Sequence, residues 1–552
     1  MRLRNWIVAP LLALIAFNVS ARAAEPTPTV LVRVKSIDGL MADARYLAGL
    51  AGQGEAFKQI DGVIPAFLGP KGLAETGLDT SRPWGLYAIL KPEIPNSPVV
   101  LLLPVSDEKT FVAALNRFGE MIPNITPKIT RGANDIYTIS VPNPLGIEGY
   151  FTVADGYAYV TAGMMNAAQL IGPQNRLSAA KLLPADEKTV VGITARLDTI
   201  DPTFKQMALG QMENRLAEIK EKKARNETPA QSKLKEQIVD HVSGQIRSLL
   251  TDGQSLDFQI VLDRKVDDIS AQLSLTAKPG SPLANLIAKQ GSQMSRFGPL
   301  AGSAVQGALK LSVPEVLLKP LSEAIEDGFK QEQGRQKDAV KKDLAQKVFN
   351  VLAPTLKAGE LDVFAGFAGP NADGKYTLAG GIKVKEAAKI EQLARDLAPM
   401  IPDPKAKEAI AFDAETIGDV KVHKITAYDL DAEGTRVFGS NATARIAFPD
   451  DAVIAAFGAD AGDVIKQIVG STAKPGGPLR FEASLSRAVG LDKDNGPRAK
   501  KAAAAAFAAN PKADMIRFTI DGGPALRLRA SMKGQVITFG VKMDEAAKGK
   551  GP

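Results

Sequence analysis

The sequence predicts an α+β protein of two related halves, each with an antiparallel twisted sheet packed by helices on one face, plus long amphipathic helices. Three observations predict this class. Short segments of alternating apolar residues indicate strands. Longer segments with helical periodicity and clear start signals separate them. Several segments recur in the same order in the second half of the chain, which is the signature of an internal repeat.

The N-terminal segment has the layout of a secretory signal peptide. Arg2 and Arg4 supply the positive charge, residues 6–17 form the apolar stretch, and Ala21 and Ala23 are the small residues before a cleavage site. We therefore expect cleavage after Ala23. The apolar run is shorter than the roughly 20 residues that span a bilayer, so we expect no transmembrane segment in the mature chain, which would be periplasmic or secreted.

The composition bounds the possible partners and chemistry. The chain has 552 residues, of which 45% are hydrophobic and 23% are charged, as in globular proteins. Its formal charge of +7 falls to +4 without Arg2, Arg4 and Arg22, so it is weak evidence for an anionic partner. Without basic–aromatic motifs, we expect no nucleic-acid partner. The absence of cysteine excludes disulfides, thiol catalysis and thiolate metal sites.

Element signals divide the chain into halves. The expected parts are a signal peptide at residues 1–23, a first α+β half at 24–290, a linker at 291–307, a second half at 308–543 and a disordered tail at 544–552. The linker is rich in Pro, Gly and Ser.

In the first half, alternation predicts strands at residues 30–34, 84–90, 99–105, 136–141, 150–153, 157–161, 190–197, 256–262 and 269–275. Helices are predicted at 37–50, after Ser106 or Asp107, and in a helical hairpin at about 202–251. The hairpin begins at Asp201-Pro202, and Thr228 with Gln231 fits a capping box.

In the second half, the same signals predict strands at residues 308–311, 363–368, 376–384, 420–428, 444–448, 452–457, 479–485, 515–520, 526–532 and 536–542. Asp373-Gly374 is a favoured hairpin turn. Helices are predicted at 316–352, 385–397 and 501–509.

An ungapped comparison supports a duplication. Residues 100–124 match 379–403, and residues 151–163 match 446–458. Two shorter segments also recur in the same order, with 32–34 on 309–311 and 194–197 on 482–485. Identity within each segment is low, and a chance match between alternating patterns is the alternative explanation.

The recurring unit is a strand, a tight turn, a second strand that ends in small residues, and a helix. Its clearest copy has the turn Asp155-Gly156, the strand through Gly163 and a helical segment at 164–171. This unit resembles that of a group of bacterial exported proteins of unknown function. The resemblance covers about residues 84–171 and their repeat, and it implies no activity.

The chain lacks recognisable catalytic motifs. Its two histidines, His241 and His423, have no partner at metal-ligand spacing, so we expect surface or structural roles for both. There is no Gly-x-Ser-x-Gly elbow, and the Ser-x-x-Lys patterns at Ser106, Ser232 and Ser471 lack their companion motifs. No phosphate-binding glycine loop occurs. We therefore predict no catalytic, cofactor-binding or metal-binding residue.

Acidic residues leave one possibility open. Asp429, Asp431 and Glu433 begin like a calcium loop, but Ser440 stands where a bidentate Glu is needed, so we expect a polar hairpin turn. A pair of catalytic carboxylates formed only in three dimensions would leave no local pattern.

The leading functional hypothesis is a non-catalytic structural or binding role outside the cytoplasm. The alternative is a carrier of a lipid or other apolar ligand between sheet and helices. A carboxylate-based hydrolase is a third hypothesis. The corresponding partner would be an envelope protein or an apolar ligand, with no cofactor.

Overall fold

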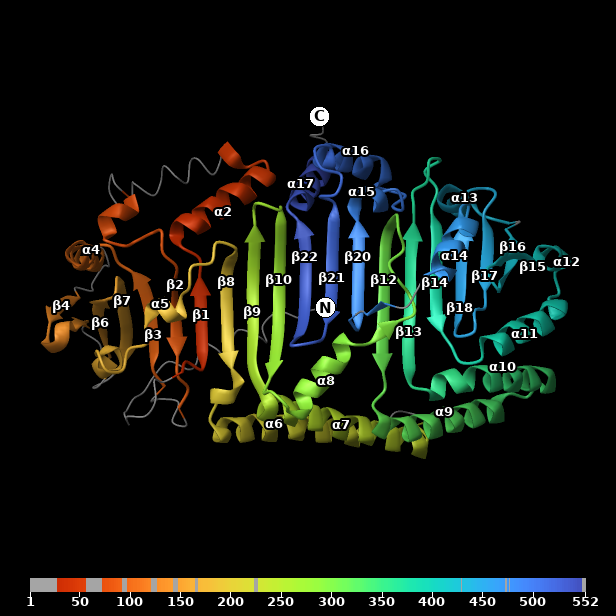
Figure 1. Ribbon diagram of the computed structural model, residues 1–552, viewed down its shortest axis with the longest axis horizontal. Helices are drawn as coiled ribbons and strands as arrows, with labels where there is room; N and C mark the ends of the chain where they lie inside the picture. Colours follow the sequence, from red (N-terminus) through yellow and green to blue (C-terminus); the bar gives the residue numbers. More distant parts are fainter. Residues whose placement is uncertain are drawn as a thin grey trace. The chain divides into compact units, whose positions relative to one another are not determined.

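The computed structural model shows an α+β chain with antiparallel sheets (Figure 1). It divides into unit 1, Met1–Leu209 with Leu249–Ser281, and unit 2, Gly210–Ser248 with Pro282–Pro552. The expected signal peptide lies outside the described residues. Among the described helices, none combines the length and apolar character that a membrane span requires. The described residues are 27–55, 72–91, 97–120, 127–141, 147–163, 167–222, 227–427, 429–471, 474–475 and 477–548.

The sheet of unit 1 has the strand order β4-β5-β6-β7-β3-β2-β1-β8-β9-β10, with each neighbouring pair antiparallel. Its strands are β1 (Val30–Val34), β2 (Trp84–Ala88), β3 (Val99–Pro104), β4 (Lys128–Arg131), β5 (Tyr137–Ser140), β6 (Glu148–Ala154), β7 (Tyr157–Gly163), β8 (Thr189–Arg196), β9 (Gly253–Asp263) and β10 (Asp268–Ala277). Its helices include α2 (Ile37–Leu50), α4 (Glu108–Glu120) and α5 (Ala179–Leu182).

Unit 1 is packed on both faces of its sheet, which corrects the expectation of helices on one face. Phe111 of α4 packs with Phe151 on one face. On the other face, Tyr87 and Tyr159 pack with Ala179 of α5. The physical reason is that β3 is a continuous apolar run rather than an alternating one, so each of its faces needs cover.

The sheet of unit 2 has the order β15-β16-β17-β18-β14-β13-β12-β20-β21-β22, again antiparallel throughout. This is the strand order of unit 1. The strands are β12 (Ser303–Ser312), β13 (Glu360–Ala368), β14 (Thr377–Lys383), β15 (Ile410–Ile417), β16 (Val420–Thr426), β17 (Thr443–Ala447), β18 (Ala452–Gly458), β20 (Leu479–Ser484), β21 (Met515–Asp521) and β22 (Leu526–Lys533).

The helices of unit 2 include α8 (Pro282–Gly291), α9 (Glu315–Arg335), α10 (Ala339–Lys357), α11 (Ala387–Leu397), α12 (Pro404–Glu408), α13 (Ala432–Phe438), α14 (Ala461–Val469), α15 (Leu485–Ala488), α16 (Gly496–Phe507) and α17 (Gln535–Ala547). Short strands β11 (Met294–Ser295) and β19 (Lys474–Pro475) also pair. The core lies on one face of the sheet, where α14 supplies Ile465 and Ile468 against Phe364 and Ile454. Phe297 completes this cluster.

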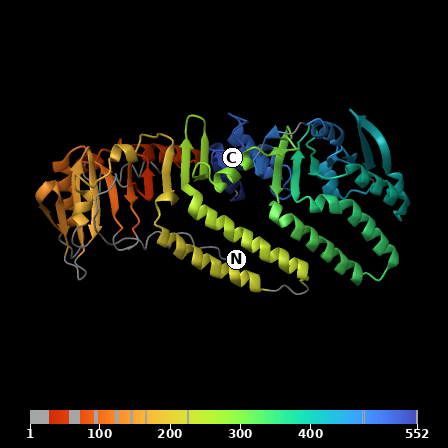
Figure 2. The same cartoon turned by 60° about the horizontal axis from the view of Figure 1, so that its bottom comes forward.

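Two long helical hairpins are visible in Figure 2. The predicted capping box is confirmed, since Thr228 N donates to Gln231 and Gln231 N donates to Thr228. It starts α7 (Pro229–Asp252), which follows α6 (Pro202–Glu221). The charged helical region predicted at about 316–352 consists of two helices, α9 and α10, because Asp338 caps a new helix there.

Three further expectations are corrected. The segment predicted as a strand at 536–542 and residues 544–547 of the predicted tail belong to α17, whose Phe539 stacks on Phe507 of α16. This packing overrides the β propensity of the segment. The predicted linker already contains the start of β12. The acidic segment beginning like a calcium loop is the start of α13, because Asp431 accepts a hydrogen bond from Gly434 N.

Truncating one residue on each face of the unit 2 sheet will distinguish the packed face from the opposite face by the loss of stability. Ile454→Ala removes a side chain that is 0% exposed, and we expect it to lower the free energy of unfolding by about 3 kcal/mol. Ile382→Ala, on the opposite face, removes a side chain that is 38% exposed, and it should cost about 1 kcal/mol. Urea denaturation followed by circular dichroism measures both, and equal losses would contradict this assignment of faces.

Candidate functional site

The face of the unit 2 sheet opposite its core is apolar. Side chains alternate between faces along a strand, and the cross-strand register brings one apolar set onto this face. We call this set the open face. Its members are Val305, Leu309 and Leu311 (β12), Leu361, Val363 and Phe367 (β13), Leu378 and Ile382 (β14), Val453 and Phe457 (β18), Leu479 and Phe481 (β20), and Ile516, Phe518 and Ile520 (β21).

The described residues leave most of the open face uncovered, and Phe457 is an exception because it packs against Phe438 of α13. Leu361 is 38% exposed, and Leu378 and Phe481 are each 39% exposed, although they lie within the sheet. No member of the open face belongs to a hydrophobic core cluster of the described residues. A contiguous exposed apolar area on a monomer marks an interaction site.

A row of small residues crosses the open face. Gly307 pairs with Ala365, Ala365 pairs with Gly380, and Gly380 pairs with Ala455. These four residues form the small-residue strip. At its ends the same row continues into the large side chains of Phe481 and Ile446.

Two rows of large apolar side chains flank the small-residue strip. One row consists of Leu309, Val363, Ile382 and Val453, and the other consists of Val305, Phe367, Leu378 and Phe457. The strip residues carry no side chain or a methyl group only. The floor of the strip therefore lies lower than both flanking rows.

The corresponding face of unit 1 has no such strip. At the matching strands it carries Val32, Leu86 and Leu101 in register. On its β9 strand, Leu256 and Ile260 are exposed. Large side chains thus fill the positions that glycine and alanine occupy in unit 2.

Unit 2 carries a second apolar surface on its helical hairpin. A cleft of about 400 Å³ lies along α9 and α10. Phe329 and Phe349 stack beside it with their centroids 3.8 Å apart, and Leu352 and Leu356 line it. This cleft is apolar almost throughout.

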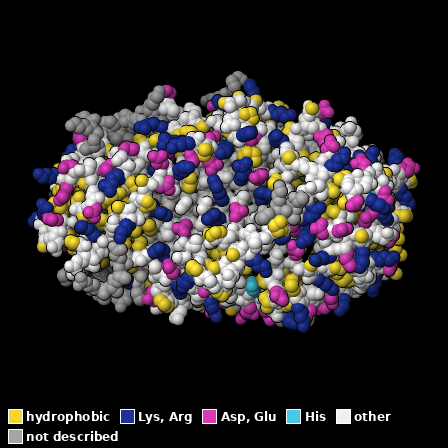
Figure 3. Space-filling view, viewed as in Figure 1, with side chains coloured by type: hydrophobic (Ala, Val, Ile, Leu, Met, Phe, Trp, Pro, Cys, Tyr) yellow, Lys and Arg dark blue, Asp and Glu magenta, His cyan; other side chains and the backbone are white. Residues whose placement is uncertain are grey.

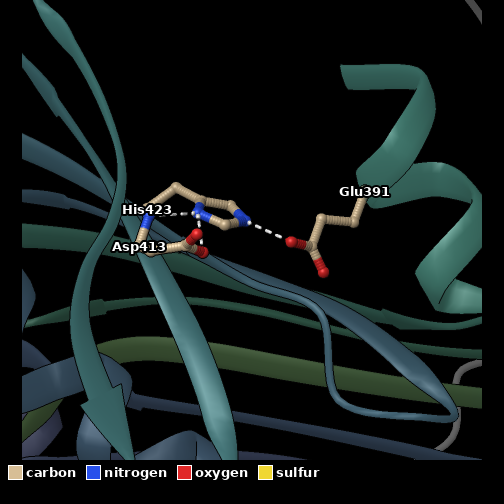
Figure 4. Close-up of side chains that lie close together, drawn as sticks. All are labelled: Glu391, Asp413 and His423. Carbon is tan, nitrogen blue, oxygen red and sulfur yellow. Dashed lines mark hydrogen bonds and ion pairs between the residues drawn. The ribbon is translucent and has the colours of Figure 1, made fainter. Parts of the chain in front are cut away.

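A charged cluster stands beside the open face, where α11 meets β15 and β16 (Figure 4). His423 follows Ile446 in cross-strand register, so it continues the row of the small-residue strip. Its Nε2 lies 3.3 Å from Glu391 Oε1, and its Nδ1 accepts a hydrogen bond from the backbone N–H of Asp413 at 3.1 Å. The imidazole is 3% exposed.

Arg395 joins the two carboxylates of this cluster. Its guanidinium lies 2.6 Å from Glu391 Oε1 and 2.5 Å from Asp413 Oδ1. It also stacks over Phe412, whose ring packs edge-on against His423. The Arg395 hydrogen bond is the main cause that lowers the pKa of Asp413.

Burial lowers the pKa of His423 from its ordinary value of 6.5. Arg395 acts in the same direction, whereas Glu391 and Asp413 oppose it. The hydrogen bond into Nδ1 leaves the ring proton on Nε2, facing Glu391. The folded chain therefore holds His423 as the neutral Nε2–H tautomer at neutral pH.

This arrangement favours a structural role over catalysis or metal binding. One ligand atom each from Glu391, Asp413 and His423 lie within 4.8 Å of one another, close enough to hold an ion. However, Arg395 already pairs with both carboxylates and Lys421 pairs with Asp413, so a metal would have to displace them. Neither ring nitrogen is open to a substrate proton. The cluster therefore ties α11 to β15 and β16.

The two histidines lie in different surroundings. His241 lies on α7, within 3.4 Å of Gln245. His423 has the acidic neighbours that its sequence surroundings do not reveal, because Glu391 lies on another element. Alternation along β16 places Val422 in the core and His423 on the opposite face, and no local pattern signals the approach of Glu391.

Buried acids give no support to a hydrolase. Among the described residues, Asp43, Asp362 and Asp514 are buried. Asp43 pairs with Lys35, Asp362 accepts from Ser295 and from Arg296 N, and Asp514 accepts from Ser484. They lie on α2, on β13 and immediately before β21, and each is engaged by cations or hydroxyls.

Comparisons of the chain with protein-family models, curated proteins and solved structures find no match. The site must therefore be interpreted from its geometry.

The titration of His423 can be followed directly, because the chain has only two histidines. We expect its imidazole pKa to lie below 6.5 in the folded chain, since burial penalises its charged form. NMR of the imidazole C–H signals measures it, and His241→Gln assigns the remaining resonance.

The same shift predicts how stability depends on pH. Between the lowered folded pKa and the unfolded value of about 6.5, the unfolded chain binds more protons. The free energy of unfolding should therefore fall as pH falls through that window, and His423→Phe should remove this part of the dependence. A stability that rises on acidification in the same window would contradict the assignment.

Proposed function

We propose that this protein binds the hydrocarbon chain of a lipid on the open face of unit 2. The observation that carries the proposal is the small-residue strip, set between two rows of large apolar side chains of which only Phe457 stacks with a described helix residue. Of the functions that the sequence leaves open, the carrier of an apolar ligand is the one that this geometry favours.

The shape of the face favours a linear ligand over a flat protein partner. The strip crosses four neighbouring strands, β12, β13, β14 and β18. Since strands lie about 4.8 Å apart, it extends over roughly 14 Å. A hydrocarbon chain in this position would contact the Gly and Ala floor from above and the flanking Leu, Ile, Val and Phe side chains from both sides.

The charged cluster favours a ligand with a polar end. The row that contains the strip leads through Ile446 to His423, beside which Arg395 is partly exposed. A lipid that lies along this row would place its head group near the guanidinium while its chain occupies the strip. The α9–α10 cleft offers further apolar contact within the same unit.

Two broader expectations accompany this proposal. Export after cleavage behind Ala23 would deliver the chain to the envelope or beyond, where lipids need carriers. Duplication of one ancestral unit is supported by the identical strand order of the two units. The small-residue strip distinguishes the second unit from the first.

Binding of a dansyl-labelled fatty acid to the mature chain, residues 24–552, tests the function. We expect saturable fluorescence enhancement that unlabelled fatty acid reverses. Ala365→Phe and Ala455→Phe place rings on the strip and should weaken binding at least tenfold, because the chain loses its contact with the floor.

Ala505→Phe is the matched control, since Ala505 is an exposed alanine of α16 and does not belong to the open face. It should bind like the unsubstituted chain, and circular dichroism checks that every variant folds. No enhancement with the unsubstituted chain, or equal losses in control and strip variants, would refute the proposal.

A further inference from the structure

Unit 1 contains a polar cavity of about 620 Å³ on one face of its sheet. Its floor is made by residues of β1, β8, β9 and β10, and α5 stands at its side. Because Arg33 alternates with Val32 and Val34, the cavity lies on the face opposite to those valines. A volume of this size accommodates a small organic molecule.

The floor of the cavity is a connected hydrogen-bond network. Arg33 Nη2 donates to Thr194 Oγ1 at 3.1 Å, and Thr194 Oγ1 donates to Asp257 Oδ1 at 2.7 Å. Ser255 Oγ donates to Asp257 Oδ2 at 2.6 Å and lies 2.8 Å from Thr276 Oγ1. Both oxygens of Asp257 are therefore engaged by hydroxyl groups of the floor.

The charged side chains that line the cavity are mostly cationic. Its lining carries the cations Arg33, Lys181 and Arg196 and the single acid Asp257. Arg33 Nε is buried and has no hydrogen-bond partner among the described residues. A buried donor without a partner is costly in a folded protein, so the Arg33 guanidinium at the floor of the cavity is not fully satisfied by its hydrogen bond to Thr194.

One wall of the cavity is apolar. Leu31, Leu177 and Leu182 line it beside the polar floor. A ligand with a charged end and a less polar body would match both surfaces, while a bare inorganic ion would leave most of the volume unfilled.

We propose that this cavity binds a small soluble organic anion, the size of a sugar phosphate or a tricarboxylic acid. Guanidinium groups suit this role because their forked N–H donors match carboxylate and phosphate oxygens. Arg33 holds the anion from the floor, and Arg196 meets it from the end of β8. The site lies on a different unit from the open face and does not depend on the lipid proposal.

Isothermal titration calorimetry of the mature chain with citrate, glucose 6-phosphate and inorganic phosphate tests the site. We expect saturable binding of at least one organic anion, stronger than that of inorganic phosphate, and weakened by added salt. Arg196→Gln should weaken it at least tenfold. Lys109→Gln is the matched control, because it removes an exposed cation of α4 outside the cavity and should leave the affinity unchanged.

Asp257→Asn separates charge recognition from simple structural damage. Removing the only acid of the lining should strengthen anion binding severalfold, whereas a merely structural role for the network would weaken or abolish it. Asp257→Asn and Arg196→Gln together test the proposal without changing Arg33, whose hydrogen bond to Thr194 is part of the floor.

A flotation assay with vesicles of phosphatidylcholine and phosphatidylglycerol tests the alternative that the cavity binds a lipid head group. Loss of vesicle binding in Arg196→Gln, without any binding of soluble anions to the unsubstituted chain, would overturn the proposal in favour of a lipid head group. Absence of binding by all soluble probes at millimolar concentration would overturn it as well.

Discussion

Antiparallel pairing with a side-chain period of two is the constraint on which both units depend. In β18, Ile454 enters the core beside α14, while its neighbours Val453 and Ala455 turn to the open face. A shift of one residue in any of these pairings would exchange the two sets and expose the core. The register therefore defines the packed interior and the open face together, and neither can change without the other.

This register gives the two faces different chemistry in each unit. In unit 2, one face is sealed by α14 and by Phe297, and the other presents aliphatic rows around the small-residue strip. In unit 1, β3 is apolar on both sides, so helices are needed on both. Farther along the same sheet, Thr194 and Asp257 make one face polar and form the floor of a cavity. One strand order thus supports two surfaces of dissimilar chemistry.

Ion pairs hold helices to the sheet, and the charged side chains do not form a surface of one sign. On the face that carries α8, basic and acidic side chains are interspersed (Figure 3). In the cluster around Arg395, this guanidinium bridges two carboxylates, Lys421 also pairs with Asp413, and His423 stays neutral in a buried position. Such a network couples α11 to the sheet and positions a partly exposed cation beside the open face.

The sequence by itself determined the elements with local signals: the capped start of α7, the turn at Asp373-Gly374, most of the alternating strands and their recurrence. These depend on neighbours within a few residues. Tertiary structure decided the rest. Packing on α16 made α17 a helix, and strand pairing aligned Gly307, Ala365, Gly380 and Ala455. Their alignment, like the approach of Glu391 to His423, joins distant positions through register and helix docking, and no local pattern encodes such contacts.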